Sequence, residues 1–205
     1  MSSKKIRETY LEAGEFFGGV VDQVDIDGWD GPALGEWCAR DLAGHTYRSF
    51  TTVLSYSAKP GDKVELERPV DYFLKASEGL ADPKQVAERG RAAGLEIIDD
   101  PKLMVRGFAM YVKNKLEELS DDHIMATPVG GIRLIDYLPT RTFELIIHTI
   151  DLAKAVSVDD KPPESGMETT LQILGQLALY RGYAPNLILA ATGRHGLPEG
   201  FSVLS

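Results

Sequence analysis

One helical segment, residues 138–156, restricts the fold of this chain more than any other part of the sequence. Its apolar side chains cover nearly the whole circumference of the expected helix, which is typical of a helix buried inside a bundle. Because an unpaired buried charge costs several kcal/mol, any polar stripe on it must face a metal ion, an internal salt-bridge network or a water-filled cavity. One narrow stripe is polar, at steps of three, four and three residues: Arg141, Glu144, His148 and Asp151.

The spacing on this stripe favours a metal site. Glu144 and His148 are four residues apart, so both side chains project from one face at adjacent turns. A carboxylate oxygen and an imidazole nitrogen can then reach one cation at about 2.0–2.2 Å. A third ligand is available in His45, which follows Leu42 on the apolar stripe of an expected second helix and therefore points inward. Three protein ligands with one open position are typical of a catalytic zinc site.

Two other interpretations of these residues remain open. Arg141, Glu144, His148 and Asp151 could form a buried ion network that needs no metal. The bundle could also be a non-catalytic module stabilised by a metal, in which case the fourth coordination position would be closed. Cys38 precedes His45 by a rise of about 10.5 Å along a helix, too far to share one ion easily, so we interpret it as a small buried hydrophobe.

The composition excludes several classes of protein. The 205 residues carry 31 acidic and 22 basic side chains, and the net charge of −9 argues against nucleic-acid binding. A single cysteine excludes an intramolecular disulfide and a multi-cysteine zinc site. No apolar run approaches the ~18 residues of a membrane span, and the N-terminal sequence lacks the apolar core of a signal peptide. We therefore expect a cytoplasmic protein.

Helical periodicity recurs along the chain and indicates an α-helical bundle of one domain. Residues 187–191 fit either a short strand or a buried helical turn. His123 and His195 are expected at the surface. The other expected elements are a helix over 6–24, a helix over 34–57, an irregular connection over 63–80, a short peripheral helix opened by Asp82-Pro83, a helix over 101–119, a small hairpin between 123 and 135, the helix over 138–156, and a helix opened by a Ser165–Glu168 capping box that ends near Arg181.

Two motifs resemble the signatures of a known family. The segment Trp37-Cys-Ala-Arg-Asp-Leu-Ala-Gly-His45 resembles the W-(T/S)-x-R-D-L-x-x-H signature of mycothiol-dependent maleylpyruvate isomerase-like proteins. These proteins belong to the DinB-like metal-binding helix bundles. The segment from Arg141 to Ala153 resembles their second signature, R-x-x-E-x-x-x-H-x-x-D-L-A. Two motifs about a hundred residues apart are more specific than either alone.

The resemblance implies a mainly α, DinB-like four-helix bundle over residues 1–157, with residues 158–205 packing on the same domain as a C-terminal helix and tail. Position by position, it assigns a divalent metal, commonly zinc, to His45, Glu144 and His148. It also implies mycothiol as cosubstrate. The isomerase itself carries a substantial C-terminal α/β domain, and fewer residues follow the metal helix here, so the resemblance supports the class better than a particular reaction.

We therefore expect a metal-dependent enzyme of the maleylpyruvate isomerase type, acting on a small electrophilic or anionic substrate. A thiolate would add to the substrate and then leave again, which is a cis–trans isomerisation, or stay attached, which is an S-transfer. The expected partners are this thiol and this substrate, without nucleic acid or membrane, and a homodimer is left open. The alternative is a non-catalytic metal-binding bundle that serves in stress response or binding.

Three further side chains have expected roles around this site. Asp151 is expected to accept an N–H from a ligand histidine and so to fix its tautomer. Arg141 is expected to form a salt bridge beside the ligands, with binding of an anionic substrate as the alternative. Arg194 is a candidate for carboxylate binding, because a planar guanidinium matches that group, with a plain surface role as the alternative.

Overall fold

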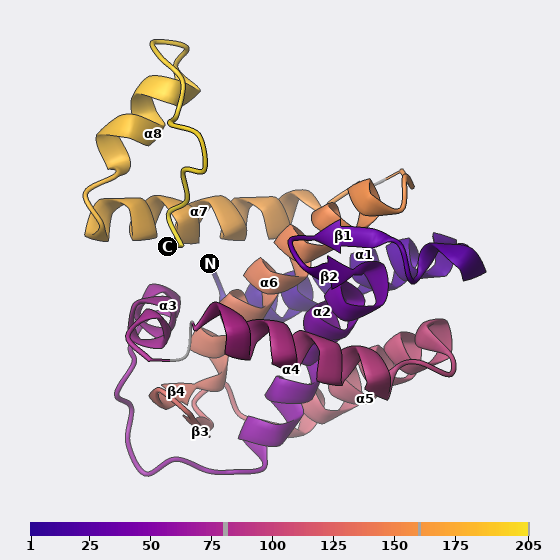
Figure 1. Cartoon of the computed structure of the whole chain (residues 1–205). Coiled ribbons are helices and arrows are strands. Elements are labelled where there is room, and N and C mark those ends of the chain that lie inside the picture. The colour runs from indigo at the N-terminus through magenta and orange to yellow at the C-terminus, as the bar shows by residue number, and fades with distance from the viewer. Residues whose placement is uncertain (80–81, 160, 205) are drawn as a thin grey trace.

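Four long helices form the bundle, and their apolar faces meet in one core (Figure 1). The computed structural model describes residues 1–79, 82–159 and 161–204. Helix α6 packs against both α1 and α2, which agrees with the apolar circumference of its sequence. The four helices are α1 (Ser3–Gln23), α2 (Ala39–Ser57), α5 (Pro101–Glu118) and α6 (Leu134–Ala155).

Helix α6 begins one turn before the predicted position, at Leu134, and contains Pro139. The predicted hairpin leads directly into this helix. Its strands are β3 (Ile124–Thr127) and β4 (Gly130–Arg133), which pair antiparallel.

The second helix begins at Ala39, later than the predicted start at residue 34. A small hairpin precedes it, formed by β1 (Pro32–Leu34) and β2 (Trp37–Cys38). Gly35 turns between the strands with a φ of 57°, a conformation that glycine adopts without a steric penalty. Leu34 is consequently exposed and is not part of the helical stripe.

The predicted irregular connection over 63–80 is wrong in its second half, where the chain forms helix α3 (Pro69–Ser77). Two common signals of a helix start mark its N-terminus. Pro69 lies at the first helical position, and the Asp71 carboxylate accepts the backbone N–H of Arg68 at 3.0 Å. Val70 of this helix is fully buried.

Helices α4 (Pro83–Glu96) and α5 both begin where the sequence predicts. The Asp82 carboxylate accepts the N–H of Lys84 at 2.9 Å, and the Asp100 carboxylate accepts that of Leu103 at 2.9 Å. Helix α4 is not peripheral, however. It packs closely against α2 and, in Figure 1, crosses the front of the bundle.

The C-terminal segment forms helices α7 (Glu164–Tyr180) and α8 (Ala184–Ala191). The predicted capping box is wrong, because Ser165 lies inside α7 and donates its hydroxyl hydrogen to the Glu12 carboxylate of α1. Residues 187–191 are helical rather than a strand. Helix α7 packs on α6, whereas α8 projects away from the bundle (Figure 1).

The structure confirms a mainly α-helical fold with small hairpins. A second, smaller core joins the C-terminal segment to α3 and α6, and its buried members are Val70, Phe143, Ile173, Leu177, Ala178 and Val203. Among the described helices, none is both long and apolar enough to cross a membrane.

Candidate metal centre

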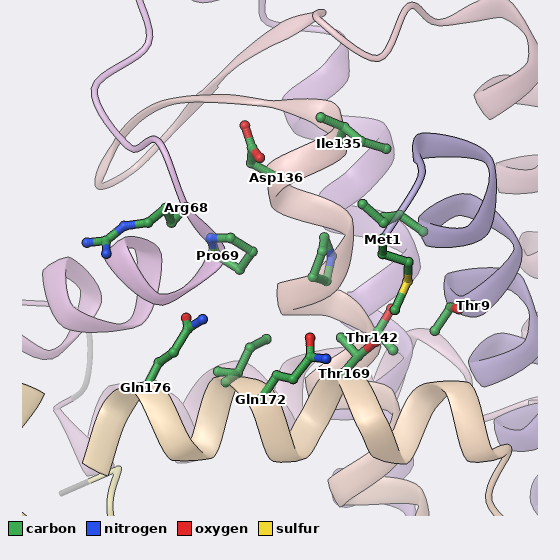
Figure 2. A pocket seen from close by; sticks show the side chains of 13 residues that line it. Met1, Thr9, Arg68, Pro69, Ile135, Asp136, Thr142, Thr169, Gln172 and Gln176 are labelled. Atoms are coloured by element: carbon green, nitrogen blue, oxygen red, sulfur yellow. The ribbon is translucent and has the colours of Figure 1, made fainter. Parts of the chain in front are cut away.

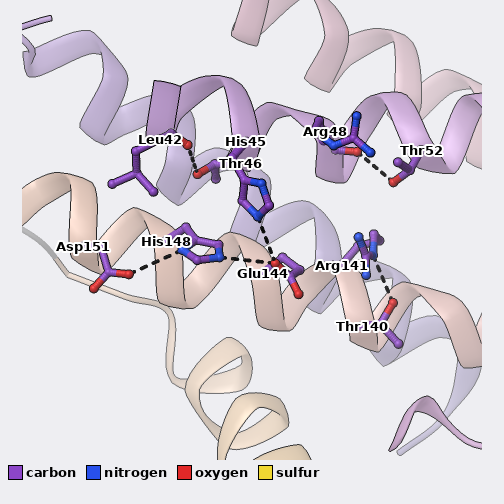
Figure 3. Close-up of polar contacts among 10 residues, drawn as sticks. All are labelled: Leu42, His45, Thr46, Arg48, Thr52, Thr140, Arg141, Glu144, His148 and Asp151. Atoms are coloured by element: carbon purple, nitrogen blue, oxygen red, sulfur yellow. Dashed lines mark hydrogen bonds and ion pairs between the residues drawn. The ribbon is translucent and has the colours of Figure 1, made fainter. Parts of the chain in front are cut away.

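The three expected ligands converge between helices α2 and α6 (Figure 3). His45 projects from α2, while Glu144 and His148 project from adjacent turns of α6. One ligand atom from each residue lies within 4.8 Å of the other two. Two segments about a hundred positions apart in the sequence therefore place two imidazoles and a carboxylate around one point.

The separations between these atoms fit an ion at that point. The Glu144 Oε2 atom lies 3.6 Å from His45 Nε2 and 3.3 Å from His148 Nε2. Hydrogen bonds between nitrogen and oxygen usually measure about 2.7–3.2 Å, so both contacts are long. Ligand atoms at about 2.1 Å from one tetrahedral ion lie about 3.4 Å apart. The donor set and its spacing therefore suit a divalent cation such as Zn²⁺.

The other ring nitrogens show how each histidine is held. His148 Nδ1 lies 3.4 Å from the Asp151 carboxylate, an ion-pair contact that is too long to be a hydrogen bond. His45 Nδ1 is buried and has no hydrogen-bond partner in the described part of the chain. The His45 ring instead packs against Trp37, with ring centroids 4.7 Å apart. Sequence reasoning missed this role, although Trp37 opens the motif that ends at His45.

The electrostatics of the cluster keep Glu144 ionised. Burial raises the pKa of Glu144, but His148, His45 and Arg141 outweigh it and hold the pKa well below the usual range. Burial lowers the pKa of His45, whereas the Asp151 and Glu144 carboxylates overcome burial and raise that of His148 to about 9. In the absence of metal, His148 therefore carries a proton that an incoming ion must displace.

A cavity of about 400 Å³ opens beside the cluster. His45 and Glu144 line its wall together with Arg141 and the aromatic side chains of Tyr56 and Tyr72. Among the described residues, only His45, Glu144 and His148 form a group suited to one metal ion. An ion held by these three would therefore keep a side facing the cavity, where a small molecule can approach.

Arg141 does not form the expected salt bridge with any carboxylate in the described chain. Its guanidinium lies over the rings of Tyr72 and Tyr137, with distances of 5.1 and 4.9 Å to the ring centroids. Its Nε donates to Thr140 Oγ1 at 3.0 Å. The sequence pattern could not show this arrangement, because Tyr72 belongs to a helix that was not predicted.

The remaining candidates lie away from the cluster. Arg194 and His195 are exposed in the segment after α8, and Arg194 does not line the cavity. His123 is half-buried rather than exposed, and its Nε2 lies 2.9 Å from the Ser57 carbonyl oxygen. Cys38 precedes α2 and is not among the grouped ligands.

A second cavity, of about 240 Å³, lies between α1, α3, α6 and α7 (Figure 2). The charged side chains that line it already have partners, since Arg68 pairs with Asp71 and Asp136 pairs with Arg133. No histidine lines it. This cavity therefore lacks the reactive groups of the first one.

Comparison with known proteins finds a similarity of fold. No family model matches the sequence, and no curated protein matches it significantly. The chain is similar to the crystal structure of the mycothiol-dependent maleylpyruvate isomerase, with a TM-score of 0.59 and 14% sequence identity. The match covers 87% of this chain and 70% of that chain. The two proteins share a fold.

The shared fold agrees with the mainly α bundle that the sequence predicts. At this level of identity, the similarity to the isomerase concerns the fold alone. What the chain does must be argued from its own site.

Proposed function

We propose that this protein is a metal-dependent enzyme that uses a low-molecular-weight thiol to convert a small electrophilic substrate. The observation that carries the proposal is the cluster of His45, Glu144 and His148, of which His45 and Glu144 line the wall of a cavity. Three ligands with an accessible side are the arrangement of catalytic rather than structural zinc sites. The similar isomerase depends on mycothiol, which makes mycothiol the first thiol to test.

In the proposed reaction the metal ion would ionise the thiol, and the side chains of the protein would hold the ion. When bound, a divalent ion such as Zn²⁺ ionises a thiol that coordinates it. His45, Glu144 and His148 would hold that ion, and Asp151 would keep the His148 ring in position. The thiolate would add to one carbon of a double bond conjugated to a carbonyl group, and the electron pair of the double bond would move onto that carbonyl as an enolate, which leaves a single bond that can rotate. Loss of the same thiolate returns the pair and restores the double bond in the other geometry, whereas protonation of the neighbouring carbon by the proton that the thiol released gives an S-conjugate.

A non-catalytic metal module is the second candidate. It would require a closed fourth position, and the described residues provide only three grouped ligands. A metal-free ion network is the third candidate, because the same side chains form ion pairs with one another. The long nitrogen–oxygen separations favour an ion over this network.

A thiol-dependence assay tests the proposal. Metal-loaded protein would be mixed with mycothiol and a panel of electrophiles that includes maleyl-type acids, and isomers and conjugates would be followed by chromatography. We expect turnover that requires both thiol and metal and is lost in His148→Ala. His195→Ala, which alters an exposed histidine, serves as the matched control. Metal binding without turnover for any pair would favour the non-catalytic module.

A further inference from the structure

The cavity between α1, α3, α6 and α7 lies on the other side of α6 from the metal cluster (Figure 2). Its α6 side chains include Asp136, Pro139 and Thr142, which share one face at steps of three residues. At about 100° of rotation per residue, this face points away from the face that carries Arg141 and Glu144. No residue lines both cavities, so this one is a separate site.

Apolar side chains and a small volume limit what this cavity can hold. Its apolar wall includes Ile6 of α1, Ile135 and Pro139 of α6, and Ile173 of α7. The volume of about 240 Å³ equals the share of roughly eight water molecules in the liquid. Sites for drug-sized ligands usually occupy about 300–1,000 Å³. The cavity therefore has the size for one small ring.

Three polar side chains on the wall are mainly hydrogen-bond acceptors. Thr142 and Thr169 each donate the hydroxyl hydrogen to the backbone carbonyl four residues earlier, at 3.2 and 3.0 Å. A hydroxyl has one hydrogen and two lone pairs, so these two groups can only accept from a ligand. Gln172 uses one amide hydrogen on the Glu168 carboxylate at 3.2 Å and keeps its amide oxygen. A ligand that matches them must donate.

Two more polar side chains on the wall have no hydrogen-bond partner in the described part of the chain. Gln176 is exposed, and its amide can both donate and accept. Figure 2 shows Gln172 and Gln176 projecting from α7 towards α3 and α6. Thr9 is only 1% exposed, and its Oγ1 atom is buried without a partner. A buried hydroxyl in this state costs free energy, so a polar group supplied from the cavity would be stabilising.

The charged side chains of the cavity neutralise one another in pairs. Arg68 donates two hydrogen bonds to the Asp71 carboxylate, at 3.2 and 2.6 Å. Asp136 accepts one from Arg133 Nε at 2.5 Å. A charged ligand would lose water here and meet no unpaired side-chain charge of opposite sign among the described residues. The wall therefore favours an uncharged ligand.

We propose that this cavity binds an uncharged ring polyol, such as a monosaccharide or a cyclitol. Ligand hydroxyls would donate to Thr142, Thr169 and Gln172, and a ligand oxygen would accept from Gln176. The C–H faces of the ring would pack on the isoleucines and Pro139. Because four helices form the wall, the ligand would join the C-terminal segment to the bundle. This site goes beyond the proposed function and does not depend on it.

A ligand series of similar size tests the chemistry of the site. The isotope-labelled protein would be titrated with D-glucose, myo-inositol, glucosamine, glucuronate and 1,4-dioxane, and binding followed by shifts of its amide NMR signals. We expect glucose or inositol to bind at least about tenfold more tightly than dioxane, a ring whose oxygens only accept. Glucosamine and glucuronate should bind no more tightly than glucose. Glucuronate also tests whether the amino group of Met1, which lines the cavity, attracts an anion.

Variants locate the binding site. Thr169→Val and Gln176→Met each remove one hydrogen-bonding group and should weaken polyol binding about 3–10-fold. Thr170→Val is the matched control. Thr170 is next to Thr169 on α7, has the same 6% exposure and also donates to the carbonyl four residues earlier, but does not line the cavity. Gln176 is exposed, so Gln176→Met keeps the test open if Thr169→Val unfolds.

Three results would overturn the inference. The first is a dissociation constant above about 10 mM for both polyols. The second is binding of dioxane or of a charged sugar more tightly than that of glucose and inositol. The third is polyol binding by Thr169→Val and Gln176→Met that equals that of Thr170→Val. Polyol binding to metal-free protein, lost in the two cavity variants alone, would support it.

Discussion

Glu144 contacts both histidines of the cluster, and its negative charge helps to raise the pKa of His148. Its carboxylate contacts an imidazole from each of two helices and lies in the field of the buried Arg141. Without metal, the contacts with the two imidazoles and the charges of His148 and Arg141 stabilise the ionised carboxylate. A metal ion would take over that role and release the proton of His148.

Substitution of Asp151 tests whether its carboxylate supports the metal site. Asp151→Asn removes the charge that lies 3.4 Å from His148 Nδ1, and with it the carboxylate that we predict to orient the ring. We expect the affinity for Zn²⁺ to fall about 10–100-fold with the helix content unchanged. Competition with a chromogenic chelator measures the affinity, and circular dichroism checks the fold. An unchanged affinity would mean that Asp151 has no part in the site.

Helical periodicity was sufficient to place Glu144 and His148 on one face and to point His45 into the bundle, and the resemblance of the two motifs assigned the three residues to one ion. The sequence was insufficient for Arg141 and Trp37. Arg141 lies over the ring of Tyr72 in α3, and the indole N–H of Trp37 donates to the Ala87 carbonyl oxygen in α4. No local sequence pattern shows how these two helices pack against the rest of the bundle. Local spacing predicts faces, whereas contacts between distant helices depend on the whole fold.

At the scale of elements, the close approach of α4 to α2 depends on glycine. A Cβ atom added at Gly44 would lie 2.2 Å from the backbone nitrogen of Gly94, so α4 would have to move away. We expect Gly44→Ala to lower the free energy of unfolding by roughly 1–3 kcal/mol. Gly18→Ala in α1 is the control, because a Cβ there meets no atom within 4 Å. Alanine has a higher helix propensity than glycine, so Gly18→Ala should stabilise the protein by up to about 1 kcal/mol.

Urea denaturation of Gly44→Ala, Gly18→Ala and the wild type measures their free energies of unfolding. Equal unfolding free energies for Gly44→Ala and the wild type would contradict the close contact between the helices.

Arg7 joins α1 to the end of α5 and gives a prediction for pH. Its guanidinium donates to the carbonyl oxygens of Leu116 and Leu119 at 2.5 and 2.9 Å and to the Asp121 carboxylate at 2.7 Å. The hydrogen bond from Arg7 holds the pKa of Asp121 below its usual value. The stabilisation from this ion pair is therefore present above the ordinary aspartate pKa of 3.8 and is lost as the pH falls through the lowered value.

Arg7→Gln should lower the unfolding free energy by about 1–2 kcal/mol at pH 7, mainly through the lost bonds to the carbonyls. The difference from the wild type should shrink as the pH falls below 3.8 towards the lowered pKa at which Asp121 of the folded protein becomes protonated. Thermal melts of both proteins between pH 7 and pH 3 check this. A difference that grows on acidification would contradict the assigned pair.

Two elements escaped prediction for physical reasons. The stripe over residues 34–57 keeps a helical period through the hairpin before α2, so periodicity alone could not show that the helix begins at Ala39. Helix α3 spans only Pro69–Ser77, which is too short for a clear period, although Pro69 and Asp71 mark its start. Start signals would have been the better guide for both elements.

At the scale of the whole molecule, the C-terminal segment contributes to the core and to the cavity. Ile173 and Leu177 of α7 pack with Val70 and Phe143, and Arg181 lines the cavity wall. The division of the chain at residue 157 stays a prediction. We expect a chain that ends there to lose several kcal/mol of stability, because buried apolar side chains of α3 and α6 would face water.

Thermal denaturation of the truncated chain and of the full chain measures this loss. If the two chains unfold at the same temperature, residues 158–205 do not belong to the cooperative unit.

The most direct test of the account is the metal content of the protein after reconstitution with Zn²⁺ and removal of excess ion. The full chain and the His195→Ala control should retain about one equivalent, and His45→Ala should retain little, because two ligands from one helix bind far less tightly than three from two helices. An unchanged metal content in His45→Ala, or none in the wild-type protein, would contradict the convergence of α2 and α6 on a single ion.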